Sequence, residues 1–222
     1  MSLLSPLLRA DPASPRLTVY DDARGTRMEF SGQTLENWAS KVANMLDEEF
    51  ELDADSTVRI DLPVSWQAAV IALGTYNSSR IPLFDGTPHT PSVVFTSLAG
   101  AETWNGLPEC DCVVVSDDPF GRGVVEAGDT LPPGTIDFGP TVRFYGDQYF
   151  GESPELCAFA RDELGAERYW VPHWSTTEEF EHAVLAPLAA GGSVVLAAGL
   201  VSADRMQEIA EIEKVTRFLT AG

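Results

Sequence analysis

The chain alternates short β-branched runs with helical patterns, and this alternation constrains its fold more than any other feature of the sequence. Residues 58–62 form a compact run that is apolar at alternate positions, Pro63 ends it, and residues 66–76 form a nearly all-apolar helical pattern. Further strand patterns lie at residues 81–84, 93–96 and 112–116. Because strands that alternate with helices build parallel sheets, we predict an α/β fold with a mostly parallel sheet flanked by helices.

The N-terminal part predicts a β-hairpin followed by a long helix. Residues 18–21 and 27–30 are short strand patterns around the turn composition Asp-Ala-Arg-Gly at 22–25. After residues 31–34, apolar residues repeat with the period of an amphipathic helix that ends near Glu49. The chain start has no basic leader before its apolar run, so we expect a first helix or a frayed terminus rather than a signal peptide.

The second half contains an uncharged stretch that matches a membrane span in length only. Residues 183–203 include no charged side chain, but Pro187 and the pair Gly191-Gly192 interrupt them, and they are rich in Ala rather than Leu. We therefore predict a helix, a turn and a buried strand in this stretch.

The strand and helix patterns divide into two similar βα subdomains, which we place at residues 1–135 and 136–222. One continuous domain is the alternative, since 222 residues fit either arrangement. Residues 128–147 are rich in Gly and Pro, with alternating apolar residues at 142–145. This pattern predicts a hairpin or the join between the subdomains, and we favour the join.

The charge balance excludes two classes of partner. The sequence has 34 acidic and 14 basic residues and a formal net charge of -20. This charge repels nucleic-acid phosphates and anionic lipid, so we expect no nucleic-acid and no membrane binding. A solvated acidic surface is the simplest interpretation, and a docking face for a basic partner is the alternative.

Three cysteines indicate a reducing compartment. The count is odd, and Cys110 and Cys112 lack the second pair that a metal site of this spacing needs. We therefore predict a cytoplasmic protein without a disulfide framework or a metal site. We expect Cys157 to be a small buried hydrophobic residue and His89 to lie in a surface turn.

Residues 170–216 carry four motifs in a fixed order. Pro172 and His173 end a strand pattern, Pro-Leu-x-x-Gly-Gly at 187–192 forms a turn, residues 194–196 form a Val-Val-Leu strand, and Lys-Val-Thr at 214–216 ends a second helix. This order resembles the middle of the adenylate-forming superfamily, which comprises acyl-CoA synthetases, luciferases and nonribosomal peptide adenylation domains.

The first half resembles the beginning of the same superfamily. The matching positions are Thr34, Leu35 and Glu36, then residues 55–58, then Pro63, Ser65 and Trp66, then residues 81–83. The chain departs from the family at residues 77–80, where Asn-Ser-Ser-Arg stands in place of Lys-Ala-Gly and leaves the turn without its glycine. The resemblance implies a truncated relative of AMP-binding enzymes, with a fold similar to part of the N-terminal domain of acyl-CoA synthetases.

The catalytic parts of the family are missing from the matching positions. Adenylation needs a loop of free backbone N–H groups rich in Gly, Ser and Thr, a lysine, and Mg²⁺ held by a carboxylate. The interval 117–169, where the family places that loop, has only Gly121-Arg122-Gly123 and no lysine. Lys41 and Lys214 are the lysines of the sequence, and both lie in helical patterns. The resemblance therefore implies a homologue that has lost ATP-dependent activation, with no catalytic residue, cofactor or metal.

His173 and Trp174 form the candidate ligand pocket, because the family's substrate lies near this region. An imidazole at a strand end can act as a base or line a pocket. The alternative interpretation is structural: His173 precedes a helix capped by residues 175–177, with Glu178 and Glu179 in its first turn.

We therefore predict a non-catalytic homologue that acts as a binding or regulatory module. The expected partners are a small acyl or carboxylate ligand and a homodimer mate or other protein that covers exposed apolar edges. The alternative is an AMP-binding or acyl-CoA-ligase-like enzyme of altered chemistry, which uses His173 as a base and the acidic loop after Ser116 as a metal site.

Overall fold

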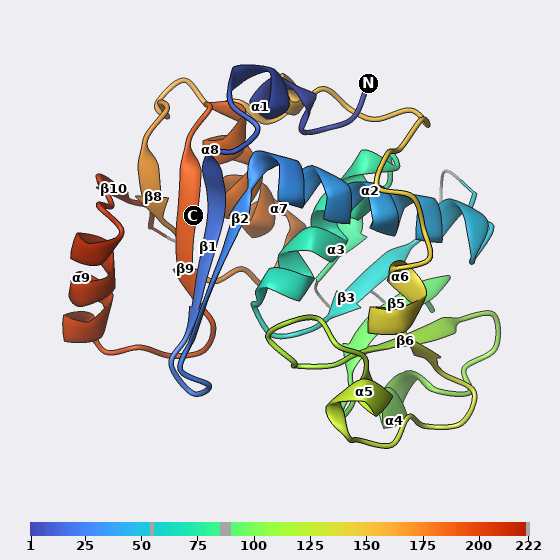
Figure 1. Ribbon diagram of the computed structural model, residues 1–222. Coiled ribbons are helices and arrows are strands. Elements are labelled where there is room, and N and C mark those ends of the chain that lie inside the picture. The colour runs from blue at the N-terminus through green and yellow to red at the C-terminus, as the bar shows by residue number, and fades with distance from the viewer. Residues whose placement is uncertain (54–55, 85–89, 221–222) are drawn as a thin grey trace. The chain divides into compact units, whose positions relative to one another are not determined.

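The computed structural model of the chain describes residues 1–53, 56–84 and 90–220 (Figure 1). The chain forms two compact units. The first unit comprises Met1–Ser2, Asn37–Leu62 and Gln67–Ser153, and the second unit comprises Leu3–Glu36, Pro63–Trp66 and Pro154–Gly222. Each unit contains one five-stranded sheet, so the α/β class is confirmed. The subdomains placed at 1–135 and 136–222 stay a prediction, and His89 lies outside the described residues.

The sheet of the first unit is built of parallel strands. They are β3 (Val58–Asp61), β4 (Pro82–Leu83), β5 (Val93–Ser97), β6 (Asp111–Val115) and β7 (Ile136–Asp137). Their order across the sheet is β4-β3-β5-β6-β7, and each neighbouring pair is parallel. The strands expected between residues 58 and 116 are confirmed. The hairpin alternative for residues 128–147 is wrong, because β7 pairs in parallel with β6.

The sheet of the second unit is mixed. Its strands are β1 (Pro15–Asp21), β2 (Thr26–Ser31), β8 (Arg168–Trp170), β9 (Ser193–Ala197) and β10 (Arg217–Phe218). Their order is β10-β8-β9-β1-β2, and β1 and β2 form the expected antiparallel hairpin, with Asp21 opposite Thr26. The other neighbouring pairs are parallel, so segments from both ends of the chain lie side by side (Figure 1).

Two helices of the first unit pack closely because one of them lacks a side chain at the contact. α2 (Gly32–Glu48) matches the helix expected from periodicity, and α3 (Trp66–Asn77) matches the nearly all-apolar helix expected at residues 66–76. Gly74 of α3 lies against Val42 of α2, and a Cβ atom built on Gly74 would lie 2.4 Å from the Cβ atom of Val42. Glycine at this position therefore sets how closely the two helices approach.

Three short helices lie near the sheet of the first unit. They are α4 (Ala101–Trp104), α5 (Val124–Ala127) and α6 (Phe138–Val142). A core cluster joins β5 and β6 to α4 and α5 through Val94, Ala101, Cys112, Val114 and Val124. The burial of these apolar side chains fixes the short helices, which are too short to be stable alone.

The second unit contains the helices of both chain ends. They are α1 (Ser5–Ala10), the 3₁₀ helix η1 (Leu156–Phe159), α7 (Thr177–Phe180), the π-helix η2 (Glu181–Leu185), α8 (Ala186–Ala189) and α9 (Ala203–Ile212). A core cluster packs Ile209 of α9 against Trp170 of β8, Val195 of β9 and Tyr20 of β1. This contact explains the apolar face of α9.

The uncharged stretch 183–203 forms the helix, turn and buried strand expected from sequence. The π-helical turn η2 directly precedes α8, whose second residue, Pro187, has no N–H for a helical hydrogen bond. Gly191 turns the chain with a φ of 79°, and Arg16 fixes this turn by donating from Nη1 to the carbonyls of Gly191 and Gly192 at 2.5 and 3.1 Å. In the described part of the chain, no helix has both the length and the apolarity needed to cross a bilayer.

The turn between α3 and β4 is made without a glycine. Ser79 takes the left-handed conformation there, with a φ of 60°. The buried side chain of Arg80 donates to the carbonyls of Leu52 and Asp53 and to the carboxylate of Asp47. These hydrogen bonds hold the end of α2 against the turn.

Candidate functional site

The sheet of the first unit reverses its strand order at β3. β4 follows β3 along the chain on one side of it, and β5 then lies on the other side. In open parallel sheets, ligands bind outside the carboxyl ends of the strands at such a reversal. A ligand site in this unit is therefore expected where β3, β5 and β6 end.

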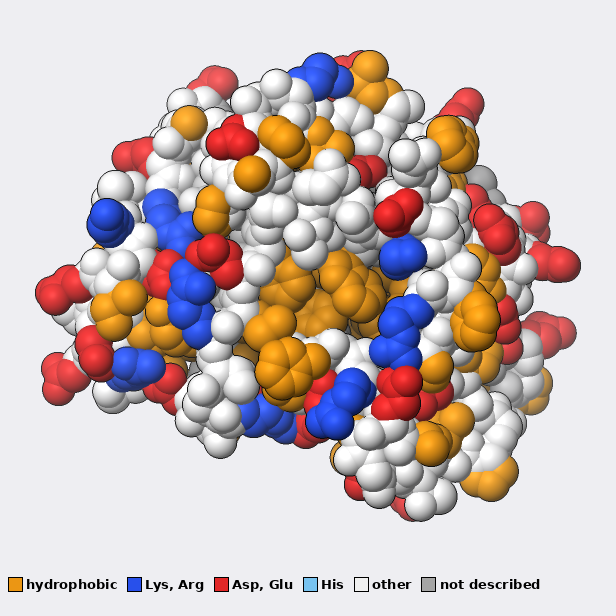
Figure 2. Space-filling view, in the orientation of Figure 1, with side chains coloured by type: hydrophobic (Ala, Val, Ile, Leu, Met, Phe, Trp, Pro, Cys, Tyr) orange, Lys and Arg blue, Asp and Glu red, His pale blue; other side chains and the backbone are white. Residues whose placement is uncertain are grey.

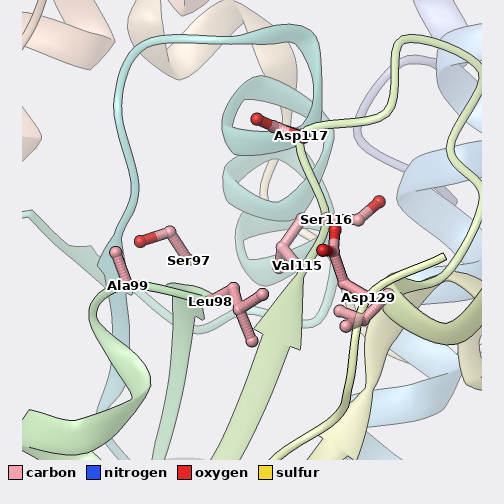
Figure 3. Close-up of a pocket in the computed structure, with 8 residues that line it drawn as sticks. Ser97, Leu98, Ala99, Val115, Ser116, Asp117 and Asp129 are labelled. Atoms are coloured by element: carbon pink, nitrogen blue, oxygen red, sulfur yellow. The ribbon is translucent and has the colours of Figure 1, made fainter. Parts of the chain in front are cut away.

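A pocket of about 410 Å³ lies at the carboxyl ends of β5 and β6 (Figure 3). It is lined by Ser97, Leu98, Ala99, Val115, Ser116, Asp117, Val124 and Asp129. The first three residues come from the end of β5, the next three from the end of β6, and the last two from α5 and the stretch after it. Two consecutive parallel strands therefore supply most of its wall.

The chemistry of this pocket is apolar and acidic. Its described lining contains two hydroxyl groups and the carboxylates of Asp117 and Asp129, and no Lys, Arg or His is among the eight lining residues. Carboxylates repel phosphates and other anions. The lining therefore suits an uncharged molecule or a cation better than an anion.

Asp61 ends β3 and holds α4 in place. Its Oδ2 atom accepts hydrogen bonds from Trp104 Nε1 at 2.7 Å and from Thr96 Oγ1 at 3.3 Å. The guanidinium of Arg59 lies over the ring of Trp104 at 5.0 Å. The carboxylate of Asp61, at the strand reversal, therefore holds α4 in position.

The turn after β6 folds around Asp118. The carboxylate of Asp118 accepts from the backbone N–H groups of Phe120 and Arg122 at 2.9 and 3.2 Å and from the Arg122 guanidinium at 2.7 Å. Burial opposes ionisation, but these hydrogen bonds hold the pKa of Asp118 below its usual value. Gln67 of α3 donates to the Asp118 carbonyl at 2.9 Å.

In the described part of the chain, no group of three or more His, Cys, Asp or Glu residues could hold a metal ion.

The backbone N–H groups that lead into α5 are bonded to the protein's own carboxylates. Gly123 N donates to Glu126 Oε2 at 2.7 Å. Val124 N and Val125 N donate to the two carboxylate oxygens of Asp137 at 3.0 and 3.3 Å. A phosphate-binding loop needs such N–H groups free, so this turn, the nearest match to one in the sequence, is closed to phosphate.

Residues 143–153 form a segment along α2, which we call the strap. Lys41 Nζ donates to the carbonyl of Tyr145 at 2.6 Å. Asn44 Nδ2 donates to the carbonyls of Gly146 and Gln148 at 2.9 and 3.0 Å. Lys41 is therefore bound to the strap.

His173 and Trp174 lie in the second unit, between β8 and α7. His173 is exposed, and its Nε2 atom lies 2.7 Å from the carbonyl of Ala197, to which it donates. Trp174 is buried and packs edge-on against Phe180, with ring centroids 5.3 Å apart. Neither residue lines the 410 Å³ pocket, and their role as a ligand pocket stays a prediction.

The helix after His173 is capped as its sequence predicts. Thr176 Oγ1 accepts from Glu179 N at 3.1 Å, and Glu179 in turn accepts from Thr176 N at 3.2 Å. Ser175 adds a backbone donor to the same carboxylate at 2.6 Å. The structural interpretation of residues 175–177 is confirmed.

Two residues lie in surroundings that differ from those expected. Cys157 is exposed rather than buried, because η1 buries its neighbour Leu156 and turns Cys157 to solvent. Lys214 lies after α9 with a φ of 55°, rather than inside the helix. All three cysteines are free.

The pocket at β5 and β6 includes Asp117 of the acidic loop after Ser116, but the sequence analysis missed its other residues. Ser97 and Ser116 each follow an apolar strand run, and this repeated pattern at two strand ends is the signal that could have found them. Asp129 has no such signal, since it reaches the pocket only through the fold of the residues after α5.

No family model matches the chain. A relative from Mycobacterium tuberculosis (strain ATCC 25618 / H37Rv), described as a TIGR03089 family protein, is 35% identical over 239 positions that cover 98% of this chain and 96% of the relative. The chain belongs to the TIGR03089 family.

This TIGR03089 family chain has the fold of part of the acyl-CoA synthetases. An acyl-CoA synthetase from Brucella canis matches it with a TM-score of 0.77 at 17% identity, over 98% of this chain and 47% of the enzyme. Acetoacetyl-CoA synthetase from Streptomyces lividans gives a TM-score of 0.73 at 16% identity, with 98% and 42% covered. The anthranilate CoA ligase AuaEII, in complex with anthranoyl-AMP, gives 0.71 at 14% identity, with 98% and 49% covered. The chain spans about half the length of these enzymes.

Proposed function

We propose that the protein is a non-catalytic binding module that uses part of the acyl-CoA synthetase fold without ATP-dependent activation. The proposal is carried by the closed turn at Gly123, where successive N–H groups are bonded to Glu126 and Asp137. Phosphoryl and adenylyl transfer depend on free N–H donors and cations around the phosphates. Here the donors are occupied and the neighbouring pocket is acidic.

The ligand we propose for the pocket at β5 and β6 is a small uncharged or cationic molecule. Leu98, Val115 and Val124 provide apolar contacts, and Ser97 and Ser116 provide hydroxyl groups at the rim. A free carboxylate would need a cation that the described lining does not supply. We also place the protein in the cytoplasm, because its cysteines are free thiols.

The test is a calorimetric titration of the folded protein with ATP and Mg²⁺, repeated with AMP, beside an assay of pyrophosphate release over a panel of carboxylic acids. The expected result is no heat with either nucleotide and no pyrophosphate. An active acyl-CoA synthetase in the same buffer serves as the positive control, and circular dichroism of the titrated sample shows that the chain is folded.

Two outcomes would overturn the proposal. Pyrophosphate release that depends on a carboxylic acid would show an active enzyme. Nucleotide binding in the micromolar range, about -8 kcal/mol, would show a phosphate site elsewhere in the fold.

A further inference from the structure

The strap of residues 143–153 is held rigidly on α2 by its two tyrosines. Tyr149 donates its phenolic hydrogen to Asp47 Oδ2 at 2.8 Å, and Tyr145 donates to Glu49. Burial, together with the hydrogen bonds to carboxylates, raises the pKa of both phenols. Together with the bonds from Lys41 and Asn44 to its carbonyls, these contacts fix the strap along the last turns of α2.

The far end of the strap is fixed at the end of α3. Ser153 donates to the backbone carbonyl of Asn77 and lies 2.9 Å from the side-chain oxygen of the same residue. Ser79 Oγ donates to the carbonyl of Glu152 at 2.8 Å. Since both ends are anchored, the surface of the strap is preformed and needs little ordering before it binds a partner.

Two phenylalanines on this preformed strap point into solvent. Phe144 and Phe150 are each 89% exposed, while the neighbouring Tyr145 and Tyr149 are directed at α2. A single exposed apolar side chain is ordinary on a protein surface. Aromatic side chains often anchor protein interfaces, and here two almost fully exposed rings lie on one anchored segment. This arrangement indicates a docking surface.

The strap and the end of α2 along which it lies are rich in carboxylates. Five of the seven residues from 47 to 53 are acidic, and the strap itself adds Asp147 and Glu152. Figure 2 shows acidic side chains gathered with apolar ones around the region where α2 ends in Figure 1. We call Phe144, Phe150 and these acidic residues the acidic aromatic surface.

The basic side chains near this surface are engaged within the protein. Lys41 donates to the carbonyl of Tyr145, and Arg80 is buried against Asp47. Arg143 donates to both carboxylate oxygens of Glu126, at 2.6 and 2.7 Å. Arg80 therefore offsets the charge of Asp47, whereas Arg143 pairs with a carboxylate outside the surface and Lys41 with a backbone carbonyl. The other acidic residues of the surface keep a surplus of negative charge.

We propose that the acidic aromatic surface docks a basic, amphipathic segment of another protein, with apolar side chains on Phe144 and Phe150 and Lys or Arg side chains opposite the surrounding carboxylates. Charge complementarity decides the kind of partner. A second copy of this chain would bring like charges together, and the same repulsion disfavours nucleic acid and anionic lipid. The inference does not depend on the proposed lack of catalysis.

The test uses a fluorescent synthetic peptide of Leu and Lys with helical amphipathic spacing, titrated with the full chain and followed by fluorescence anisotropy. Two comparison peptides replace either the Lys residues by Glu or the Leu residues by Ser. The Leu/Lys peptide is expected to bind at least about tenfold more tightly than either comparison peptide. Its affinity is expected to fall with rising salt, because screening weakens the charge attraction.

The decisive variant is F144S with F150S. It is expected to weaken binding of the Leu/Lys peptide by about tenfold or more, while thermal unfolding stays close to that of the unchanged protein, because neither ring is buried.

A second variant, E48Q with E51Q, keeps both rings but removes two negative charges. It is expected to make the affinity for the Leu/Lys peptide less dependent on salt. Leu200→Ser is the matched control: Leu200 is 98% exposed and belongs to the second unit, and its loss is expected to leave the affinity unchanged.

Several outcomes would overturn the proposal. One is equal binding by the F144S/F150S variant and the unchanged protein; another is equal binding of the Leu/Lys and Ser/Lys peptides. A concentration-dependent dimer in sedimentation that F144S/F150S abolishes would assign the surface to a second copy. Binding to anionic vesicles that the same variant abolishes would assign it to a membrane.

Discussion

Glu213 shows how a single buried carboxylate connects the end of α9 to the sheet of the second unit. Its side chain is 5% exposed. It accepts from Tyr20 of β1 at 2.6 Å, from Arg27 of β2 at 2.7 Å and from Arg168 of β8. Burial alone would raise the pKa of Glu213, but the three donors outweigh it and lower the pKa to about 2.

Replacing this carboxylate gives the first prediction. Because the pKa of Glu213 in the folded state is below its usual value of 4.5, ionised Glu213 stabilises the fold above that value, and this contribution is lost as pH falls from about 4.5 towards about 2. Glu213→Gln is expected to lower the free energy of unfolding at pH 7 by about 3 kcal/mol. Urea unfolding at pH 7 and at a series of acidic pH values measures both effects.

The control for this prediction is Glu211→Gln, which removes an exposed carboxylate from the same helix. It is expected to change the free energy of unfolding by less than about 0.5 kcal/mol. If Glu213→Gln and Glu211→Gln unfold alike, or if the Glu213 variant loses as much stability in acid as the unchanged protein, the carboxylate does not have the assigned role.

At the scale of elements, the crossing of α2 and α3 gives the second prediction. A Cβ atom on Gly74 would lie 2.4 Å from Val42 Cβ and 2.9 Å from the carbonyl oxygen of Ala39. Neither neighbour is a flexible side-chain end, so Gly74→Ala is expected to force the helices apart and to lower the free energy of unfolding by about 1–3 kcal/mol. Thermal or urea unfolding measures this change.

Gly32→Ala is the matched control for the helix crossing. Gly32 begins α2, and a Cβ atom there would meet its nearest neighbour at 3.6 Å, which is ordinary contact. This variant is expected to be neutral or slightly more stable, since alanine is the better helix former. Equal stability of Gly74→Ala and the unchanged protein would mean that the helices do not pack as closely as the structure shows.

The elements that sequence predicts well here are those with a long or characteristic residue pattern. α2 follows helical spacing over 17 residues, α3 is a nearly all-apolar run of 12 residues, and β5 and β6 are short apolar runs rich in β-branched residues. The short helices α4, α5 and α6 were not predicted, because four or five residues make little more than one turn and show no period. Cys157 was assigned to the core for the same reason, since the 3₁₀ helix η1 is too short to reveal which side faces inwards.

The candidate sites depended on contacts that are distant in sequence. The cap at Thr176 was predictable, because Glu179 is only three residues away. The closing of the turn at Gly123 was not, because Asp137 reaches it only when β7 pairs with β6. Local residue chemistry therefore predicts caps and turns, whereas the order of strands decides which polar groups meet at a pocket.

At the scale of the whole molecule, the fold persists although the sequence differs greatly from that of the solved enzymes. The structural match covers 98% of the chain at 17% identity, so apolar patterning and strand order, rather than particular side chains, maintain the architecture. Residues at the surface can vary more freely than residues in the core, and the sequence of this chain has a formal net charge of -20.

This charge gives the last prediction. Like charges spread over a surface repel one another and destabilise the compact state. Salt shortens the screening length from about 30 Å at about 0.01 M to about 3 Å at about 1 M. The thermal unfolding temperature is therefore expected to rise as NaCl is raised over this range, by about 2–4 °C for each kcal/mol of repulsion removed.

Salt also weakens ion pairs near the surface, such as Arg24 with Asp21, but each of these contributes little stability and so opposes the rise only weakly. Screening saturates near about 0.1 M, where the Debye length has fallen to about 10 Å, so most of the rise belongs at low salt. A melting temperature that falls with salt would show that attractive ion pairs outweigh the repulsion, and a rise that continues evenly to high salt would point to general salting-out of apolar surface instead.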